Sequence, residues 1–355
     1  MFDERLNLQF FAIPMDHAGL NTNVTFQQST DSSATGTYAA GADMTPEMKM
    51  YYDTELLENA RKDLYFAQFG RKQALPKGKG NSVEWRKWNT FAKPMTPLTE
   101  GVNPEGQRFG ATKIQAECSQ HGTFTAISDK LELQAVDDVI LGATEEMGAT
   151  AGETMDTLIR NALSNALTEQ FAPKVSGDTE TAVNAIGNVD ATCILTPKLV
   201  NKIATQLKKA KAPKINGDYI AIIHPSCTYD LRQSKEWIEA HKYAQPGEIY
   251  NGEIGKLHGI RFVEDDNVLV TKDGASNCAV YHNLFFGQDA YGIVDPEGAG
   301  LEMIVHGKES GGTSNPLNLY STIGFKFMYG CKVLYPERIV EVICGSEFSG
   351  TDEAN

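Results

Sequence analysis

Apolar residues recur at every fourth position between residues 46 and 69, and this spacing predicts an amphipathic helix. The apolar series consists of Tyr52, Leu56, Ala60 and Leu64. Thr45 supplies the expected cap, Pro46 occupies the first helical position, and Gly70 supplies a stop. The preceding residues 1–44 are rich in Ser, Thr, Gly and Ala, which predicts a flexible segment.

Alternation of apolar and polar residues begins at residue 82 and predicts a strand. Val83 and Trp85 fall on one face, and Glu84, Arg86 and Trp88 fall on the other. The following stretch, 92–106, contains three prolines and two glycines, which excludes a helix or a regular central strand. Alternation resumes with Ile114, Ala116 and Cys118. Residues 82–127 are therefore predicted to form a long hairpin-like excursion with an extended tip.

A third pattern, again helical, covers residues 137–169 and predicts one long helix that Asp137 caps. Its apolar positions are Ile140, Met147, Ala151, Met155, Leu158, Ala162 and Leu163. Gly142, Gly148 and Gly152 lie inside it and each costs about 1 kcal/mol relative to alanine. Such small residues indicate close packing against a neighbouring element.

The remainder mixes helices and strands without a repeating βαβ order, so the fold class is α+β. Helices are predicted from Pro197 and, as one element capped by Ser226, over the segment that follows "DYIAIIHP". Strands are predicted at "DYIAIIHP", "GIRFVED", "VLVTKD", "CAVYHNLFFG" and "AYGIVD", and as longer strands within residues 300–345.

Composition narrows the function classes. The 355 residues are 41% hydrophobic and carry a net charge of −14, whereas proteins that grip nucleic acid usually present a basic face. The six cysteines form no C-x-x-C pair, which indicates reduced thiols in a cytosolic protein. The apolar run near the N-terminus is too short for a signal peptide, and no run of 18 apolar residues predicts a membrane span.

Catalytic signatures are missing from the sequence. Gly78-Lys79-Gly80 follows a helix and precedes a strand, which is the wrong context for a phosphate loop. The seven histidines show neither H-E-x-x-H nor another metal spacing, and there is no G-x-S-x-G elbow. We therefore expect no enzyme activity, no catalytic residue, no cofactor and no metal.

Trp85 and Trp88 alternate with Arg86 and Lys87 in the first predicted strand. Such interleaving is typical of single-stranded nucleic-acid binding, of protein–protein interfaces and of ordinary half-buried hairpins. The acidic balance of the chain favours the interface. Trp85, Arg86 and Trp88 are therefore the predicted inter-subunit contact residues.

Three ordered motifs resemble the major capsid proteins of tailed bacteriophages, and specifically their N-four-like family. They are "PLTEGVNP", "ISDKLEL" about thirty residues later, and the helical "AGETMDTL" that follows. The resemblance extends from Gln68 to Leu163, and the later region is similar in texture only.

This resemblance implies the Hong Kong 97-type capsid fold, with five parts. Residues 1–74 would form the N-terminal arm and 75–127 the extended loop over a neighbouring subunit. Residues 128–184 would form the peripheral domain with its spine helix, and 185–298 the axial domain. The strands and tail of 299–355 would return to the peripheral domain.

The resemblance further implies a virion protein, assembled in the host cytoplasm, that forms pentamers and hexamers of an icosahedral shell around double-stranded DNA. Its partners would be copies of itself together with portal, scaffold, protease or decoration proteins. We expect no membrane partner. Two alternatives stay open: an encapsulin-like compartment shell, and an unrelated soluble enzyme or binding protein.

Overall fold

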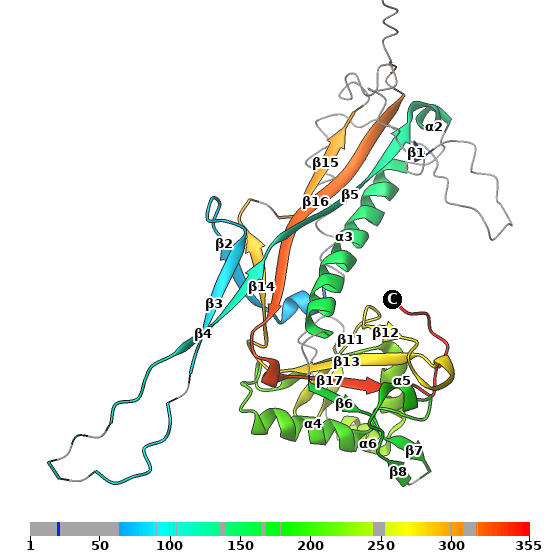
Figure 1. Ribbon diagram of the computed structural model, residues 1–355. Coiled ribbons are helices and arrows are strands. Elements are labelled where there is room, and N and C mark those ends of the chain that lie inside the picture. Colours follow the sequence, from blue (N-terminus) through cyan, green and yellow to red (C-terminus); the bar gives the residue numbers. More distant parts are fainter. Residues whose placement is uncertain are drawn as a thin grey trace, which may run out of the picture. The chain divides into compact units, whose positions relative to one another are not determined.

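The computed structural model describes residues 20–21, 64–89, 91–98, 100–101, 103, 105–134, 139–164, 168–177, 179–243, 253–298, 300–307, 317 and 319–355 (Figure 1). Of the predicted flexible segment 1–44, the described residues include 20–21 alone, and most of the predicted helix 46–69 lies outside the described residues. At the end of that helix, the described residues Phe66–Gln68 form a short 3-10 turn, η5, and not a continued α-helix.

The chain divides into two compact units. Unit 1 comprises residues 1–64, 120–155 and 298–328, and unit 2 comprises residues 65–119, 156–297 and 329–355. Strand β16 (Tyr320–Val333) and helix α3 (Val139–Ser164) contribute residues to both units.

Unit 1 is built on strand pairing around β16. Strand β15 (Glu302–His306) lies antiparallel to β16, and β5 (Ser119–Ser128) pairs with β16 and in parallel with β1 (Leu20–Asn21). Helix α2 (Asp129–Gln134) continues directly from β5. The buried side chains that hold these elements together are Ala126, Ile127, Met303, Ile323, Phe325 and Phe327.

Unit 2 contains a seven-stranded sheet in the order β10-β11-β9-β13-β17-β6, with β12 on β13. The strands are β6 (Thr168–Phe171), β9 (Tyr219–Ile223), β10 (Glu253–Leu257), β11 (Ile260–Glu264), β12 (Val270–Thr271), β13 (Val280–Phe286) and β17 (Ile339–Cys344). Every residue of β9, β13 and β17 is buried, so these neighbouring strands form the centre of the core.

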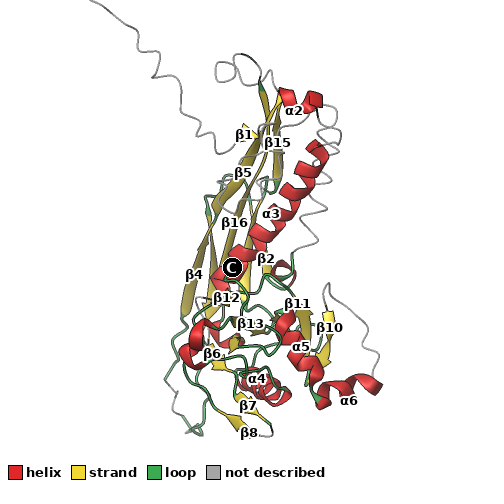
Figure 2. Ribbon diagram, turned by 90° about the vertical axis from the view of Figure 1, so that its right-hand side faces the viewer, coloured by secondary structure: helices red, strands yellow, loops and turns green. Residues whose placement is uncertain are grey.

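Helices cover this sheet. Helix α4 (Pro197–Lys209) buries Leu199, Val200, Ile203, Ala204 and Leu207. Its predicted start is confirmed, because the Thr196 hydroxyl accepts the N–H of Leu199 and Pro197 follows. Figure 2 shows helices α5 (Pro225–Gln233) and α6 (Lys235–Tyr243) beside strands β10 and β11.

Several predicted boundaries are wrong. The single helix expected after "DYIAIIHP" is two, since Ser234 adopts an extended backbone between them, and its cap is His224 and not Ser226. The hairpin ladder ends at Glu117, since β5 pairs elsewhere. Unpredicted strands are β1, β2 (Arg71–Leu75), β6, β7 (Lys174–Ser176), β8 (Thr179–Thr181) and β10. Strand β17, one of the strands expected within residues 300–345, lies in the sheet of β9 and β13.

The long helix is confirmed as α3, and its expected cap, Asp137, lies outside the described residues. Met147, Ala151 and Leu163 are buried as predicted, and so are Gly148 and Gly152. Three buried polar residues of α3 were not predicted: Thr144, Asp156 and Arg160. Asp156 is fully buried, and Arg160 donates to the backbone and side-chain oxygens of Asn267 at 3.0 Å.

Asp156 holds the turn that precedes β2. Its carboxylate accepts the backbone N–H groups of Tyr65 and Phe66 at 3.0 Å and of Ala67 at 3.3 Å. These are the N–H groups that the start of a helical turn leaves without an internal partner. The Tyr291 hydroxyl donates to the Phe66 carbonyl at 2.5 Å, so the turn is fixed from both sides.

Burial raises the pKa of the Asp156 carboxyl and that of a second carboxyl, Asp265. Desolvation, and next the charge of Asp265, raise the pKa of Asp156 to about 7, against the lowering effect of the three N–H groups. Desolvation likewise raises the pKa of Asp265 to about 7, and one of its oxygens is buried without a hydrogen bond from any described residue.

We expect Asp265→Asn to stabilise the protein increasingly as pH rises from about 4 to about 7. The native carboxyl keeps its proton up to about pH 7, whereas the unfolded chain releases it near 3.8, so its contribution to the free energy of unfolding falls across this window. The gain is on the order of a few kcal/mol, at about 1.4 kcal/mol per pKa unit.

Urea unfolding of both proteins from pH 4 to pH 8 measures this difference. The control is Asp273→Asn, which changes an exposed acid in the same unit. A difference between Asp265→Asn and wild type that does not vary with pH would contradict the prediction.

Candidate subunit interface

A two-stranded hairpin in unit 2 is the main candidate for contact with another chain. Strand β3 (Ser82–Trp88) lies antiparallel to β4 (Ala111–Glu117), from Ser82 opposite Glu117 to Trp88 opposite Ala111. We call residues 82–117 the hairpin and residues 89–110 its tip. The described residues of the tip contain no strand or helix, as the prolines and glycines predict.

The base of the hairpin is packed against its own unit. Val83, Trp85 and Ala116 are buried, while Glu84 and Arg86 face outward, so the predicted faces are confirmed. Trp85 lies over Gly292 in strand β14 (Tyr291–Pro296), where a Cβ atom would come within 2.8 Å of its indole ring. Its indole N–H is buried without a hydrogen-bond acceptor among the described residues.

Ion-pair and cation–π contacts further fix the base of the hairpin. The Lys87 ammonium lies 2.5 Å from the Glu337 carboxylate and 4.6 Å from the centre of the Tyr335 ring. The Arg338 guanidinium lies 3.8 Å from the same ring centre. Desolvation raises the pKa of Glu337, but the hydrogen bond and charge of Lys87 together with its own backbone N–H outweigh it, so the pKa is lowered and the carboxylate stays charged.

The tip is held together by its own contacts. The Gln107 side chain pairs with the backbone of Ala92, accepting its N–H at 2.7 Å and donating to its carbonyl at 2.8 Å. The Phe109 ring stacks on Trp88 at 4.4 Å and on Phe91 at 5.5 Å between ring centres. We call Trp88, Phe91 and Phe109 the aromatic cluster.

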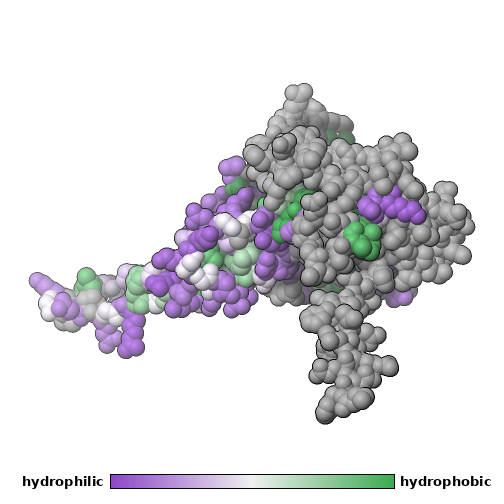
Figure 3. Space-filling view, turned by 90° about the horizontal axis from the view of Figure 1, so that it is seen from above, coloured by the Kyte–Doolittle hydropathy of each residue, from purple (hydrophilic) through white to green (hydrophobic). Residues whose placement is uncertain are grey.

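Large apolar side chains are exposed along this hairpin to an unusual degree. Five of the eleven in the described residues lie here: Trp88, Phe91, Met95, Leu98 and Phe109. Met95 is 84% exposed and Leu98 is 76% exposed. Figure 3 shows these hydrophobic patches among hydrophilic ones along the projecting segment. Large apolar side chains exposed together on one segment are typical of an interaction site.

The three predicted contact residues have different positions. Trp85 is buried in its own unit, so its indole is not available on the surface. Arg86 lies on the opposite face and its Nε donates to Glu84 at 3.2 Å. Trp88 is 55% exposed and begins the aromatic cluster. The sequence reading did not single out Phe91, Met95, Leu98 or Phe109, although apolar residues beside prolines in a predicted projection are a usable signal.

Other kinds of site are less supported. In the described part of the chain, no group of His, Cys, Asp and Glu side chains is arranged to hold a metal ion. Across the same residues, no helix has the length and hydropathy needed to cross a membrane.

A family model described as phage capsid protein matches residues 113–333, which is well over half of the chain. The chain belongs to the phage capsid protein family. Comparison with curated protein sequences gives no match.

Solved phage capsids share the fold of this capsid protein. The Cyanophage Pam1 capsid matches with a TM-score of 0.60 and 16% identity, over 93% of this chain and 100% of that one. The Cyanophage P-SCSP1u capsid matches with 0.58 and 16%, over 90% and 94%. The capsid of Ralstonia phage GP4 matches with 0.58 and 14%, over 94% and 100%.

Family and fold together make this chain a major capsid protein of a phage, a structural component of the virion shell that associates with copies of itself. The mixed α+β fold class expected from the sequence is confirmed at that level. The division into five parts and the three contact residues stay predictions.

We expect Gly292→Ala to lower the free energy of unfolding by about 1–3 kcal/mol, because the added methyl group overlaps the Trp85 indole. Gly187→Ala is the control, since nothing lies within 4 Å of the position of its Cβ atom. Thermal unfolding measures both, and equal midpoints for the two variants would contradict the packing described for the base of the hairpin.

Proposed function

We propose that this capsid protein is the shell subunit of a tailed double-stranded DNA phage, with the Hong Kong 97-type fold of the N-four-like family. Pentamers and hexamers would close an icosahedral shell after assembly in the host cytoplasm. The hairpin would be the extended loop, α3 the spine helix, and the seven-stranded sheet of unit 2 the core of the axial domain.

The observation that carries this proposal is the contrast within the hairpin. Its base is buried and ion-paired within one subunit, whereas its tip exposes four large apolar side chains and adjoins a fifth, that of Trp88. Burying one such side chain contributes roughly 1.5–3 kcal/mol, which favours a tip that docks on a neighbouring subunit. Many copies of a modest contact suffice in a closed shell, because each subunit makes several at once.

The net charge of −14 agrees with a container for DNA. Like charge disfavours tight adhesion to the phosphate backbone, so the genome can be packed and released. Portal, scaffold, protease and decoration proteins are the further partners that this function would require.

Closed particles are the first expected outcome. We expect the purified protein, alone or co-expressed with a scaffold protein, to form shells, rings or tubes of megadalton mass in negative-stain electron microscopy and light scattering. A protein that stays monomeric at high concentration and with its scaffold would contradict the proposal. Particles that hold an enzyme and no DNA in infected cells would instead identify a compartment shell.

Replacing two members of the aromatic cluster, Phe91→Ser with Phe109→Ser, is expected to abolish or strongly reduce assembly. Both rings are more than half exposed in the subunit, so the free energy of unfolding is expected to change by about 0.5 kcal/mol per site or less. Sedimentation and thermal unfolding measure the two effects separately.

The control is Phe348→Ser, which removes an equally exposed ring outside the hairpin. Normal assembly of the Phe91 and Phe109 variant would contradict the role of the tip. Arg86→Ala with Trp88→Ala tests the two surface members of the predicted contact, while Trp85→Ala is expected to act first on subunit stability, because Trp85 is buried.

A further inference from the structure

Two buried thiols are in contact in the core of unit 2. The sulfur atoms of Cys227 and Cys344 lie 3.4 Å apart, although the two residues are 117 positions apart in sequence. Both residues are fully buried. Cys227 lies in the first turn of α5, and Cys344 is the last residue of β17, so the pair joins a covering helix to the centre of the sheet.

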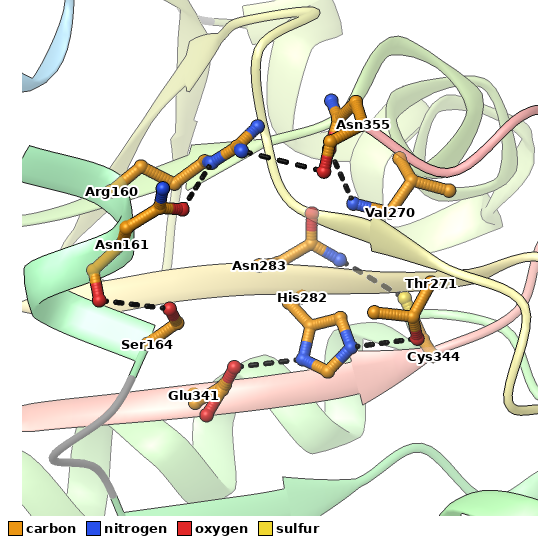
Figure 4. A network of polar contacts seen from close by, with 10 residues as sticks. All are labelled: Arg160, Asn161, Ser164, Val270, Thr271, His282, Asn283, Glu341, Cys344 and Asn355. Carbon is orange, nitrogen blue, oxygen red and sulfur yellow. Dashed lines mark hydrogen bonds and ion pairs between the residues drawn. The ribbon is translucent and has the colours of Figure 1, made fainter. Parts of the chain in front are cut away.

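The side chain of Asn283, in strand β13, holds this pair in place. Its amide nitrogen donates to the sulfur of Cys344 at 3.0 Å and to that of Cys227 at 3.4 Å, and Figure 4 shows the first of these bonds. Its amide oxygen accepts the backbone N–H of His224, the cap of α5, at 2.9 Å. One fully buried amide therefore fixes both sulfurs and the start of the helix.

The spacing suits a disulfide better than a metal ion. A disulfide bond is about 2.05 Å long, so bonding requires only a small movement of the first turn of α5 toward β17. A structural zinc ion takes four ligands. In the part of the chain that the structure describes, no three His, Cys, Asp and Glu side chains are grouped to hold a metal ion.

We propose that Cys227 and Cys344 form an oxidative modification site, which a peroxide converts to a disulfide. One sulfur attacks a peroxide oxygen, the O–O bond breaks, and a sulfenic acid and water form. The second sulfur attacks the sulfenic sulfur, the S–O bond breaks, and a second water leaves. Two thiols and one hydrogen peroxide thus give one disulfide and two waters, and two electrons pass from sulfur to oxygen.

The surroundings keep the closed pair reduced. The hydrogen bond with Cys227 and desolvation raise the pKa of Cys344, so its reactive thiolate is scarce at neutral pH. The chain after β17 is bonded next to the pair, because the Ser346 hydroxyl donates to the Ser226 carbonyl at 3.0 Å. Peroxide therefore reaches the sulfurs when this segment and the first turn of α5 open. The same burial then shields the disulfide from reductants.

The setting of this reaction rests on the proposed function. A phage shell leaves the reducing host cytoplasm on release and meets dissolved oxidants outside. A disulfide there would join α5 to β17 across a long loop and stabilise the subunit, mainly by restricting the unfolded chain. The chemistry itself needs no assembly, so the test uses the unassembled subunit and its outcome does not depend on shell formation.

Hydrogen peroxide is the probe, added to the reduced full chain. Trypsin places the two thiols in separate peptides, residues 215–232 and 339–355. After peroxide treatment, denaturation in N-ethylmaleimide and digestion without a reductant, we expect mass spectrometry to find these peptides joined, two hydrogens below their summed mass. We expect dithiothreitol to separate them.

Cys227→Ala is expected to lose the joined peptide. The matched control is Cys193→Ala, which removes an equally buried thiol that contacts the Asp190 carboxylate, and we expect it to keep the joined peptide. Conversion of Met95, which is 84% exposed, to its sulfoxide marks a sufficient dose of peroxide. Two free thiols at positions 227 and 344 after complete conversion of Met95, or sulfinic acid at either position, would overturn the proposal.

Thermal unfolding without a reductant measures the effect of the bond. We expect peroxide to raise the midpoint of the wild-type chain by roughly 5–10 °C and not to raise that of Cys227→Ala. Each chain is compared with its own untreated form, so the substitution itself does not enter. A joined peptide without a higher midpoint would contradict the stabilising role of the disulfide.

Discussion

One buried carboxylate fixes the turn of residues 65–67 in unit 2. Asp156 accepts three consecutive backbone N–H groups from residues 65–67, about ninety positions away in sequence. Strand β2 follows that turn and pairs in parallel with β14, which in turn carries the glycine against which Trp85 packs. The position of the hairpin base therefore depends on a charge that the fold removes from water. An apolar residue at 156 would leave the three N–H groups without these bonds, at about 1–3 kcal/mol for each buried one.

Under the proposed function, the hairpin divides two tasks between its halves. The base needs a unique position, and it obtains this from buried aromatic packing and from the Lys87–Glu337 ion pair. The tip needs exposed apolar surface without collapse onto its own subunit. Prolines keep the tip extended, and the Gln107 side chain joins its two arms without covering the rings. Exposed rings that are already stacked lose little conformational freedom on docking, which raises the affinity available from a small contact.

Elements with a local signal could be predicted from the sequence. The alternation around Val83 and Trp85 gave the correct faces of β3, and Thr196 with Pro197 gave the start of α4. Strands β2 and β6 could not be predicted, because "RKQAL" and "TEQF" lack alternation and exist as strands through parallel pairing with distant partners. The burial and hydrogen bonds of Asp156 could not be predicted either, because its partners are remote in sequence.

The candidate interface could also be predicted only as far as its signals are local in sequence. Periodicity placed Trp85 and Trp88 on opposite faces, but it could not say which face is buried, because Gly292 lies some two hundred residues further along the chain. The juxtaposition of Glu169 and Glu341 could not be predicted either, because these residues face each other only in the register of β6 and β17.

Strand order also has a consequence for synthesis. Strand β17 lies between β13 and β6 in the large sheet, and β16 pairs with β5, β14 and β15. The sheets of both units therefore cannot form completely until residues 320–344 have been synthesised. A growing chain must keep the apolar strands β9 and β13 from associating with other chains until these late strands leave the ribosome. Contacts this distant in sequence make folding slow, so the nascent subunit is expected to depend on chaperones more than its final stability would suggest.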